Sequence, residues 1–202
     1  MLYETDYWFW ESAIPSNLCD DIVQHGLSKQ ESKAFTGTAD DPTPEETADK
    51  IRQSNVSWLN DRWIYDTLHP YVNAANKNAG WNFDWDWSEN IQFTKYKLNH
   101  FYDWHQDAYD KVYPESHGPN QAGKIRKLSI IVTLVDGSEY DGGDLQINFR
   151  HRHKIDEIKT ITEIRPKGSV IVFPSYIFHR VTPVTRGTRY SLVNWNLGYP
   201  YR

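Results

Sequence analysis

Two histidines and one aspartate in this chain form a pattern that could bind a metal ion. His105 and Asp107 are separated by a single residue, and His179 lies much further along the chain. Two imidazoles and one carboxylate are the ligand set that holds a non-haem Fe(II) on one face and leaves the other face open. In an extended strand, side chains two residues apart point to the same side. The spacing therefore predicts an iron centre in which one segment supplies His105 and Asp107 and a distant segment supplies His179.

An arginine downstream of the second histidine could bind a ligand of that metal. Arg189 follows His179 after a turn marked by Pro183 and Gly187, on what reads as the next strand. A guanidinium is permanently charged and can donate two parallel hydrogen bonds to one carboxylate. Strand alternation places Ser191 on the same face as Arg189, where both could reach that carboxylate. A metal with an open face beside a carboxylate receptor predicts a keto-diacid co-substrate.

Ligands so far apart in the sequence meet only if distant strands lie side by side. A barrel or sandwich of β-strands that closes on itself achieves this. From residue 91 onward the chain consists of apolar and β-branched runs separated by glycine-containing turns, which is typical of strands. The predicted strands cover residues 91–97, 128–135, 145–149, 170–173 and 190–197. We predict an α+β protein built on a double-stranded β-helix, a jelly-roll or cupin-like barrel, with the metal in its mouth.

The first 90 residues read as support for that barrel. Residues 7–14 suggest a short strand, and a helix is predicted from Pro15 because apolar residues then recur at helical spacing up to Leu27. Residues 36–49 are acidic, which predicts a mobile loop that could close over a bound peptide as a lid. A second helix is predicted over residues 58–77, packed outside the barrel. We expect one domain over residues 1–202, with residues 1–90 as the helical support region and residues 91–202 as the catalytic barrel.

Composition limits the classes of partner and the location. The chain has 202 residues, 39% of them hydrophobic, and a formal net charge of −5. Because no basic surface is predicted, we expect no binding to nucleic acid or to anionic membranes. Cys19 is the only cysteine, which excludes an internal disulfide. The N-terminus lacks the basic start and apolar run of a secretory signal, and no run approaches the ~20 apolar residues of a membrane span, so a cytoplasmic protein is expected.

Three other motifs have both a functional and a structural interpretation. The basic run at residues 150–154 could bind a metal or nucleic acid, but its place between two predicted strands favours a solvated hairpin loop. Trp81, Trp85 and Trp87 are interleaved with acids, which suits a half-buried strand better than a stacking platform for bases or sugars. The run at residues 141–144, Asp-Gly-Gly-Asp, lacks the lysine and helix start of a phosphate-binding loop and predicts a tight turn.

Several motifs, in the same order along residues 91–195, resemble those of 2-oxoglutarate- and Fe(II)-dependent oxygenases of the prolyl 4-hydroxylase type, in particular the small bacterial and phage forms. The motifs are Tyr96, Tyr102, His-Gln-Asp at 105–107, Tyr-Asp-Gly-Gly-Asp-Leu at 140–145, Lys-Gly-Ser-Val-Ile-Val-Phe-Pro at 167–174, the segment from His179 to Arg189, and Trp195. Agreement of several motifs in order is a specific signal. The chain departs from the family at Asn99, where glycine is usual, and in the long polar stretch at residues 108–123.

The resemblance implies a hydroxylase and assigns roles to residues. The implied metal ligands, which are also the catalytic residues, are His105, Asp107 and His179. The implied 2-oxoglutarate ligands are Arg189, Tyr96 and Ser191, and the implied substrate-pocket residues are Tyr102 and Trp195. The cofactor is Fe(II), the co-substrates are 2-oxoglutarate and O2, and ascorbate is implied as an auxiliary. The reaction would hydroxylate an unactivated C–H of a prolyl residue in a peptide or protein and release succinate and CO2.

Other functions of the same residues remain open. The nearest is hydroxylation of a free amino acid or another small molecule at the same centre. Nucleic-acid demethylation is disfavoured, because relatives with that activity tend to carry a second arginine where this chain has Trp195. Halogenation is disfavoured by Asp107, because halogenating relatives replace this carboxylate with a small residue. A cupin-like protein that binds metal without turnover and a zinc hydrolase are further alternatives, but neither needs a carboxylate receptor such as Arg189.

Overall fold

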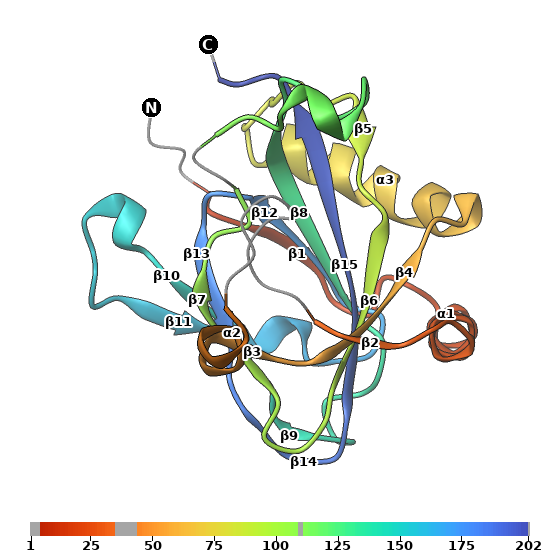
Figure 1. Ribbon diagram of the computed structural model, residues 1–202. Helices are drawn as coiled ribbons and strands as arrows, with labels where there is room; N and C mark the ends of the chain where they lie inside the picture. Colours follow the sequence, from red (N-terminus) through yellow and green to blue (C-terminus); the bar gives the residue numbers. More distant parts are fainter. Residues whose placement is uncertain (1–4, 35–43, 109–110, 202) are drawn as a thin grey trace.

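The computed structural model describes residues 5–34, 44–108 and 111–201, and two β-sheets form its centre (Figure 1). The larger sheet has eight strands, with β5 (Trp87–Ser88) paired to β15 outside the main order. That order is β1 (Trp8–Trp10), β12 (Val170–Pro174), β8 (Ile125–Thr133), β15 (Arg189–Gly198), β6 (Ile91–Tyr96), β4 (Asn55–Leu59) and β2 (Ser32–Lys33). The smaller, five-stranded sheet runs β11 (Ile158–Thr160), β10 (Leu145–Asn148), β13 (Phe178–Val181), β7 (Phe101–His105) and β3 (Arg52–Gln53).

The strand connections confirm the predicted fold class. All strand pairs in both sheets are antiparallel, and neighbours such as β8 and β15 are far apart in the sequence. A short ribbon of β9 (Asp141–Gly142) and β14 (Val184–Arg186) closes one end of the sandwich. The five strands predicted from residue 91 onward correspond to β6, β8, β10, β12 and β15. The chain is an α+β protein with a double-stranded β-helix.

Strand β8 shows how the sequence separates core from site. Its alternate residues Leu128, Ile130 and Val132 are fully buried in the apolar cluster beneath the helices. Ile131 points the other way and joins a second cluster between the two sheets, and Ser129 shares that inner face. This follows from the two-residue period of a strand, which sends successive side chains to opposite faces. The apolar run therefore supports the fold on one side and leaves single polar positions for the site on the other.

Two long helices cover the outer face of the larger sheet. Helix α1 (Ser16–Ser28) contacts β4, and α3 (Arg62–Asn78) lies against β1, β8 and β12 (Figure 1). Helix α3 buries a stripe at helical spacing, formed by Ile64, Leu68, Val72 and Ala75. Full burial of Ile64, Leu68 and Val72 contributes about 1.5–3 kcal/mol for each side chain, which holds the helix against the sheet. The predicted packing of the second helix outside the barrel is confirmed.

The N-terminal region differs in detail from the sequence-based expectation. The second helix begins at Arg62 rather than at residue 58, because Trp58 and Leu59 belong to β4 and pair with β6. The strands β1 to β4 all come from the first 90 residues, so this region adds strands to both sheets as well as helices. Part of the expected acidic loop is a short helix, α2 (Glu45–Ile51), whose residues include no glycine or proline. Residues 36–43 of the expected lid lie outside the described residues.

All three of the minor motifs differ in the structure from the role expected for them. The basic run connects β10 and β11 as predicted, but it is not simply solvated, because His151 and Arg152 both contact the Asp6 carboxylate at 2.9 Å. Of the three tryptophans, only Trp87 lies in a strand, and Trp81 is 3% exposed in the main core. The Asp-Gly-Gly-Asp run is not the expected tight turn, because Asp141 and Gly142 form β9 and pair with β14, although both glycines have a positive φ. Asn99 has a φ of 65°, a conformation otherwise typical of the glycine that the family usually has there.

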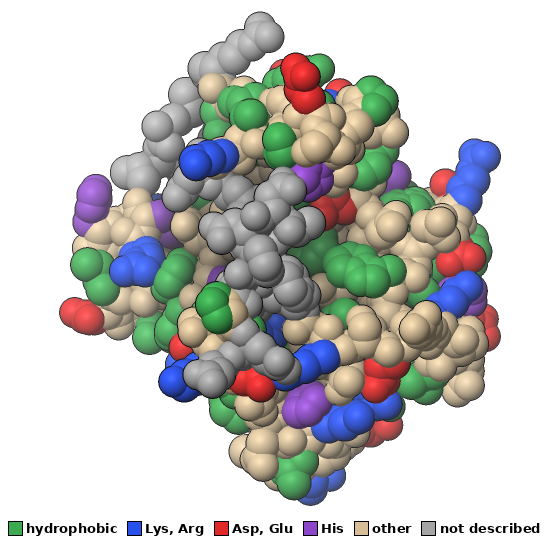
Figure 2. Space-filling model, in the orientation of Figure 1, with side chains coloured by type: hydrophobic (Ala, Val, Ile, Leu, Met, Phe, Trp, Pro, Cys, Tyr) green, Lys and Arg blue, Asp and Glu red, His purple; other side chains and the backbone are tan. Residues whose placement is uncertain are grey.

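Within the described residues, no helix combines the length and the apolar character needed to cross a membrane. On the face shown in Figure 2, basic and acidic side chains are interspersed, without a broad patch of one sign.

Candidate metal centre and the adjoining pocket

The three predicted ligands come together between the two sheets. His105 ends β7 and is the direct cross-strand partner of His179 in β13. Asp107 follows the end of β7, where its backbone N–H donates to the Ser175 carbonyl at 3.0 Å. The candidate ligand atoms of His105, Asp107 and His179 all lie within 4.8 Å of one another. Strand alternation, the basis of the prediction, does not place Asp107, because β7 stops at His105 and the anchor at Ser175 positions the carboxylate instead.

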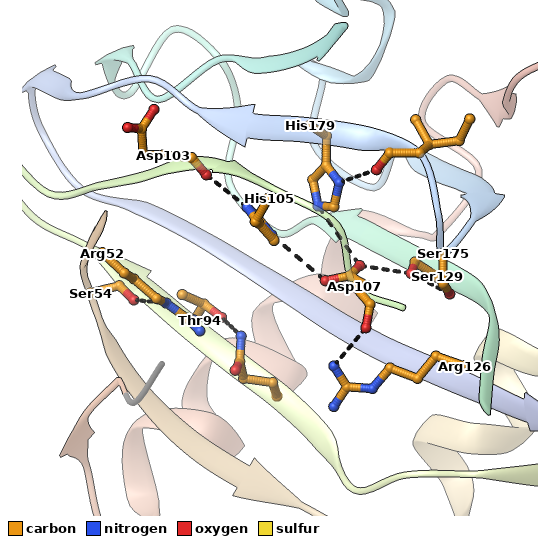
Figure 3. A network of polar contacts seen from close by, with 12 residues as sticks. Arg52, Ser54, Thr94, Asp103, His105, Asp107, Arg126, Ser129, Ser175 and His179 are labelled. Atoms are coloured by element: carbon orange, nitrogen blue, oxygen red, sulfur yellow. Dashed lines mark hydrogen bonds and ion pairs between the residues drawn. The ribbon is translucent and has the colours of Figure 1, made fainter. Parts of the chain in front are cut away.

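Hydrogen bonds orient both imidazoles toward the carboxylate (Figure 3). The Nδ1 atom of His105 lies 2.8 Å from the Asp103 carbonyl, and that of His179 lies 2.9 Å from the Ile177 carbonyl. A backbone carbonyl only accepts, so each Nδ1 carries the proton and each Nε2 keeps a free lone pair. These Nε2 atoms lie 3.6 and 3.7 Å from the two Asp107 oxygens. Such distances are too long for hydrogen bonds, so the two Nε2 atoms and the Asp107 carboxylate remain available as ligands of one metal ion.

Serine hydroxyls hold the carboxylate in place. Ser129 Oγ donates to Asp107 Oδ2 at 2.7 Å and lies 2.9 Å from Ser175 Oγ. Arg126 approaches from the same side: its Nη1 donates to the Asp107 carbonyl at 3.4 Å, and its Nε and Nη2 donate to the Glu89 carboxylate. These contacts fix one Asp107 oxygen, so that the other remains available to a metal. Sequence reasoning missed Ser129, Ser175, Glu89 and Arg126, because small polar residues inside apolar runs carry no pattern of their own.

The charge state of the site suits a divalent cation. Burial would raise the pKa of Asp107, but the neighbouring His179 and His105 rings and Arg126 outweigh it and hold the pKa well below its usual range. Burial lowers the pKa of His179 to about 4, and the nearby His105 ring adds to this effect. At neutral pH, Asp107 is therefore ionised and His179 is neutral, which is the state in which both can bind a metal. The residues fit the two-histidine, one-carboxylate set expected for iron.

Arg189 is buried in the same pocket as the candidate ligands. It is 2% exposed, and its Nη1 donates to Ser191 Oγ at 3.2 Å. Its cross-strand partner on β6 is Tyr96, whose ring centre lies 5.4 Å from the guanidinium carbon. Among the described residues, no carboxylate forms an ion pair with Arg189. Gly143 packs against the aliphatic part of the Arg189 side chain, since a Cβ at this position would lie 3.0 Å from the Arg189 Cδ atom.

The pocket contains every site residue predicted from the sequence. These are Tyr96, Tyr102, His105, Asp107, His179, Arg189, Ser191 and Trp195. The Tyr102 ring stacks on the His105 ring at 3.5 Å, and Trp195 lies under the Arg126 guanidinium at 3.9 Å. The predicted metal ligands, 2-oxoglutarate ligands and substrate-contacting residues therefore line the same pocket.

Five further residues line this pocket and were not predicted. They are Arg52, Gln92, Ile131, Val181 and Val193. Gln92 and Thr94, whose side chains are hydrogen-bonded at 2.8 Å, precede Tyr96 at two-residue spacing in β6, so alternation from Tyr96 would have found them. Arg52 lies in a two-residue strand, too short for any periodic signal. Its side chain nevertheless reaches the pocket, 4.5 Å from the centre of the Tyr102 ring.

Comparison with known proteins identifies the family. The model of the 2OG-Fe(II) oxygenase superfamily matches residues 91–196, just over half of the chain. The chain belongs to this superfamily, and its resemblance to the small prolyl 4-hydroxylase-like members is confirmed. It is 35% identical over 107 residues to a PKHD-type hydroxylase, YbiX, of Shigella boydii, and 35% identical over 104 residues to a PKHD-type hydroxylase of Xylella fastidiosa. These matches cover 51% and 52% of this chain but only 40% and 42% of the relatives.

Solved structures show the same fold over nearly the whole chain. A Pseudomonas putida prolyl-4-hydroxylase aligns over 96% of this chain and 92% of its own, with a TM-score of 0.65 and 18% identity. The viral collagen prolyl hydroxylase of Paramecium Bursaria Chlorella virus-1 aligns over 96% of this chain and 97% of its own, with a TM-score of 0.59 and 17% identity. At these identities the comparison bears on the fold, and it agrees with the double-stranded β-helix seen here.

Proposed function

We propose that this chain is an Fe(II)- and 2-oxoglutarate-dependent dioxygenase that hydroxylates a prolyl residue in a peptide or protein and releases succinate and CO2. The observation that carries this proposal is the position of Arg189. A buried guanidinium without a carboxylate partner among the described residues shares one pocket with a two-histidine, one-carboxylate cluster. A metal-binding protein without turnover or a zinc hydrolase would have no use for that receptor.

Different residues of the pocket would bind the metal and the co-substrate. His105, Asp107 and His179 would bind Fe(II), which supplies the redox chemistry that activates O2. Arg189 would hold the far carboxylate of 2-oxoglutarate, supported by the Ser191 hydroxyl and by Tyr96. The ketoacid end of the co-substrate would then point toward the three proposed metal ligands. Ascorbate as an auxiliary remains a prediction.

The pocket walls would keep water from the reacting groups. Asp107 and His179 are 6% and 3% exposed, and apolar side chains of Ile131, Val181 and Val193 surround them. Burial of this kind strengthens electrostatic contacts with a bound co-substrate and suppresses side reactions. Tyr102 and Trp195 would contact the substrate at the edge of the pocket.

A prolyl substrate is supported by the relatives and not by a contact in this chain. One solved neighbour, with a TM-score of 0.64 and 14% identity, is a Trichoplax adhaerens prolyl hydroxylase in complex with a peptide fragment of the hypoxia inducible factor oxygen degradation domain. The fold therefore accommodates peptide substrates in at least one member. The expected cytoplasmic location and the lack of a nucleic-acid partner remain predictions.

Incubation with Fe(II), 2-oxoglutarate and a proline-containing peptide array tests the proposal. We expect succinate release that depends on the peptide, and a product heavier by one oxygen atom. The matched control is His179→Ala, which removes one proposed ligand and should abolish both signals. A metal-loaded protein that binds 2-oxoglutarate but releases no succinate with any peptide or free amino acid would refute the assignment as a hydroxylase.

A further inference from the structure

We propose that Arg52 binds a carboxylate of the substrate, so that the enzyme selects substrates with an anionic group close to the carbon that is hydroxylated. This inference rests on the proposed function and names a substrate class for the same site. It does not concern the co-substrate, whose far carboxylate is assigned to Arg189.

Arg52 carries a buried charge that nothing in the described structure neutralises. Its side chain is 6% exposed, and its Nη2 atom is buried without a hydrogen-bond partner. The only acceptor for its other nitrogens among the described residues is the neutral Ser54 hydroxyl, 2.9 Å from Nε. A guanidinium cannot escape this cost by losing its proton. A buried and unpaired charge is strongly unfavourable, so a ligand that supplies an anion at this position gains affinity from pairing with it.

The position of Arg52 places this charge beside the reaction centre. Its guanidinium carbon lies 4.5 Å from the centre of the Tyr102 ring, and that ring stacks at 3.5 Å on the His105 ring. Together these separations keep the guanidinium within about 8 Å of the His105 ring centre. In Figure 3, Arg52 extends from its strand toward Thr94, on the side of the site where His105 lies. A carboxylate held there would be only a few bonds from a carbon that reacts at the metal.

Two arginines in one pocket match two different carboxylates. The co-substrate has one carboxylate at its ketoacid end, next to the metal, and one at its far end. A single guanidinium satisfies the far end through two parallel hydrogen bonds. Arg189 has the support for that role, because Ser191 and Tyr96 lie beside it. Arg52 instead lies against Tyr102, the residue expected to contact the substrate, and is therefore left for the substrate itself.

Three sources could supply the carboxylate, and their chemistry is the same. They are an acidic side chain next to the target proline, the C-terminal carboxylate of a peptide that ends in proline, and the carboxylate of a free amino acid. The acidic composition of residues 36–49 favours basic residues elsewhere in the same peptide. An anionic group inside the pocket and basic residues further along the peptide are compatible.

Matched pairs of substrates test the inference in the metal-loaded enzyme with 2-oxoglutarate. The pairs are a peptide with Glu or Gln beside an internal proline, a peptide with C-terminal proline as acid or amide, and free proline or prolinamide. We expect the anionic member of at least one pair to have a kcat/KM at least about tenfold higher, as is typical for a buried charge pair. The pair that shows this preference identifies the source of the carboxylate.

Substitutions of Arg52 assign the preference to this residue. Arg52→Gln should remove the preference by lowering kcat/KM for the anionic member, with little effect on the neutral member and on the KM for 2-oxoglutarate. Arg52→Lys should keep part of it, because the charge remains but the planar fork is lost. The matched control is Arg62→Gln on α3, where the side chain is 92% exposed. Circular dichroism and Fe(II) titration of each variant separate a substrate effect from loss of the fold.

A binding measurement keeps this inference distinguishable from the proposed function. Tryptophan fluorescence with Mn(II) in place of Fe(II) reports substrate binding without turnover. Binding that prefers the anionic members and is lost in Arg52→Gln supports the role of Arg52, even if no product forms. The absence of product would refute the proposed hydroxylase activity instead. Equal binding and equal use of both members of every pair by the unmodified protein would overturn the inference. An equal loss for acid and amide in Arg52→Gln would overturn it as well.

Discussion

Replacing Arg189 with alanine should weaken the use of 2-oxoglutarate strongly. The guanidinium is 2% exposed, so a salt bridge formed there is little screened by water. Truncating one partner of a buried, hydrogen-bonded charge pair costs about 2–5 kcal/mol. This range corresponds to roughly a 30-fold to a few-thousandfold rise in the half-saturating concentration of 2-oxoglutarate. The neutral Ser191 hydroxyl and Tyr96 lie beside Arg189 and could not replace its charge, which favours the upper part of the range.

The assay is the 2-oxoglutarate dependence of succinate formation, measured beside an Fe(II) titration of the same variant. Arg189→Lys should recover part of the loss, because it keeps the charge without the planar fork. The matched control is Arg186→Ala, three residues earlier, where the side chain is 56% exposed and paired with Asp141 at the surface. Metal affinity should stay unchanged, since Arg189 contacts none of the three candidate ligands. An alanine variant with an unaltered half-saturating concentration would show that Arg189 does not bind the co-substrate.

Three further predictions concern the metal and the stability of the fold. Alanine at any one of the three candidate ligands should abolish Fe(II) binding and turnover while the far-ultraviolet circular dichroism stays native, and a variant with near-normal turnover would contradict the ligand assignment. Glu89→Gln breaks a buried pair with Arg126 and should lower the free energy of unfolding by about 3–5 kcal/mol in urea titrations, whereas a loss below about 1 kcal/mol would show that the pair is effectively solvated. Burial would raise the pKa of Asp6, but hydrogen bonds from His151 and Arg152 outweigh it and lower the pKa from 3.8. Ionised Asp6 therefore stabilises the fold at pH values above 3.8, and this stabilisation is lost as the pH falls through the lowered pKa of Asp6. The free energy of unfolding of Asp6→Asn should be lower than that of the unmodified protein by about 1–3 kcal/mol at pH 7, and the difference should shrink in acid. A difference that does not change with pH would contradict this.

Much of the barrel and the candidate site could be predicted from the sequence because their signals are local. The apolar run that becomes β8 is recognisable by itself, and the glycine turns around it mark where the chain reverses. The two histidines and the aspartate are the residue types that iron binds, and the structure brings them together. Arg189 was found by its place after His179 and the turn that follows it, Ser191 was found by alternation from Arg189, and β15 retains that alternation.

The contacts that the sequence did not reveal all depend on pairing between distant segments. Arg52 enters the pocket only because β3 pairs with β7, which sets Arg52 opposite Tyr102. A two-residue strand has no period, and an arginine beside an acidic segment reads as a solvated residue. Trp58 was assigned to a helix because its spacing from later apolar residues fits one. Its pairing with Gln92 on β6 overrides that local preference.

The cross-strand pairing of His105 with His179 also has a consequence for the motions of the protein. Both histidines belong to the smaller sheet, whereas the Asp107 carboxylate is tied to β8 of the larger sheet through Ser129. An ion bound by all three residues would link the two sheets. At a free concentration one hundred times its Kd, the ion would stabilise the folded protein by about 2.7 kcal/mol. Amide hydrogens of β7 and β13 should then exchange more slowly with the ion present, while those of α1, on the far side of the larger sheet, should respond least. Binding of the metal ion would thus make separation of the two sheets less frequent.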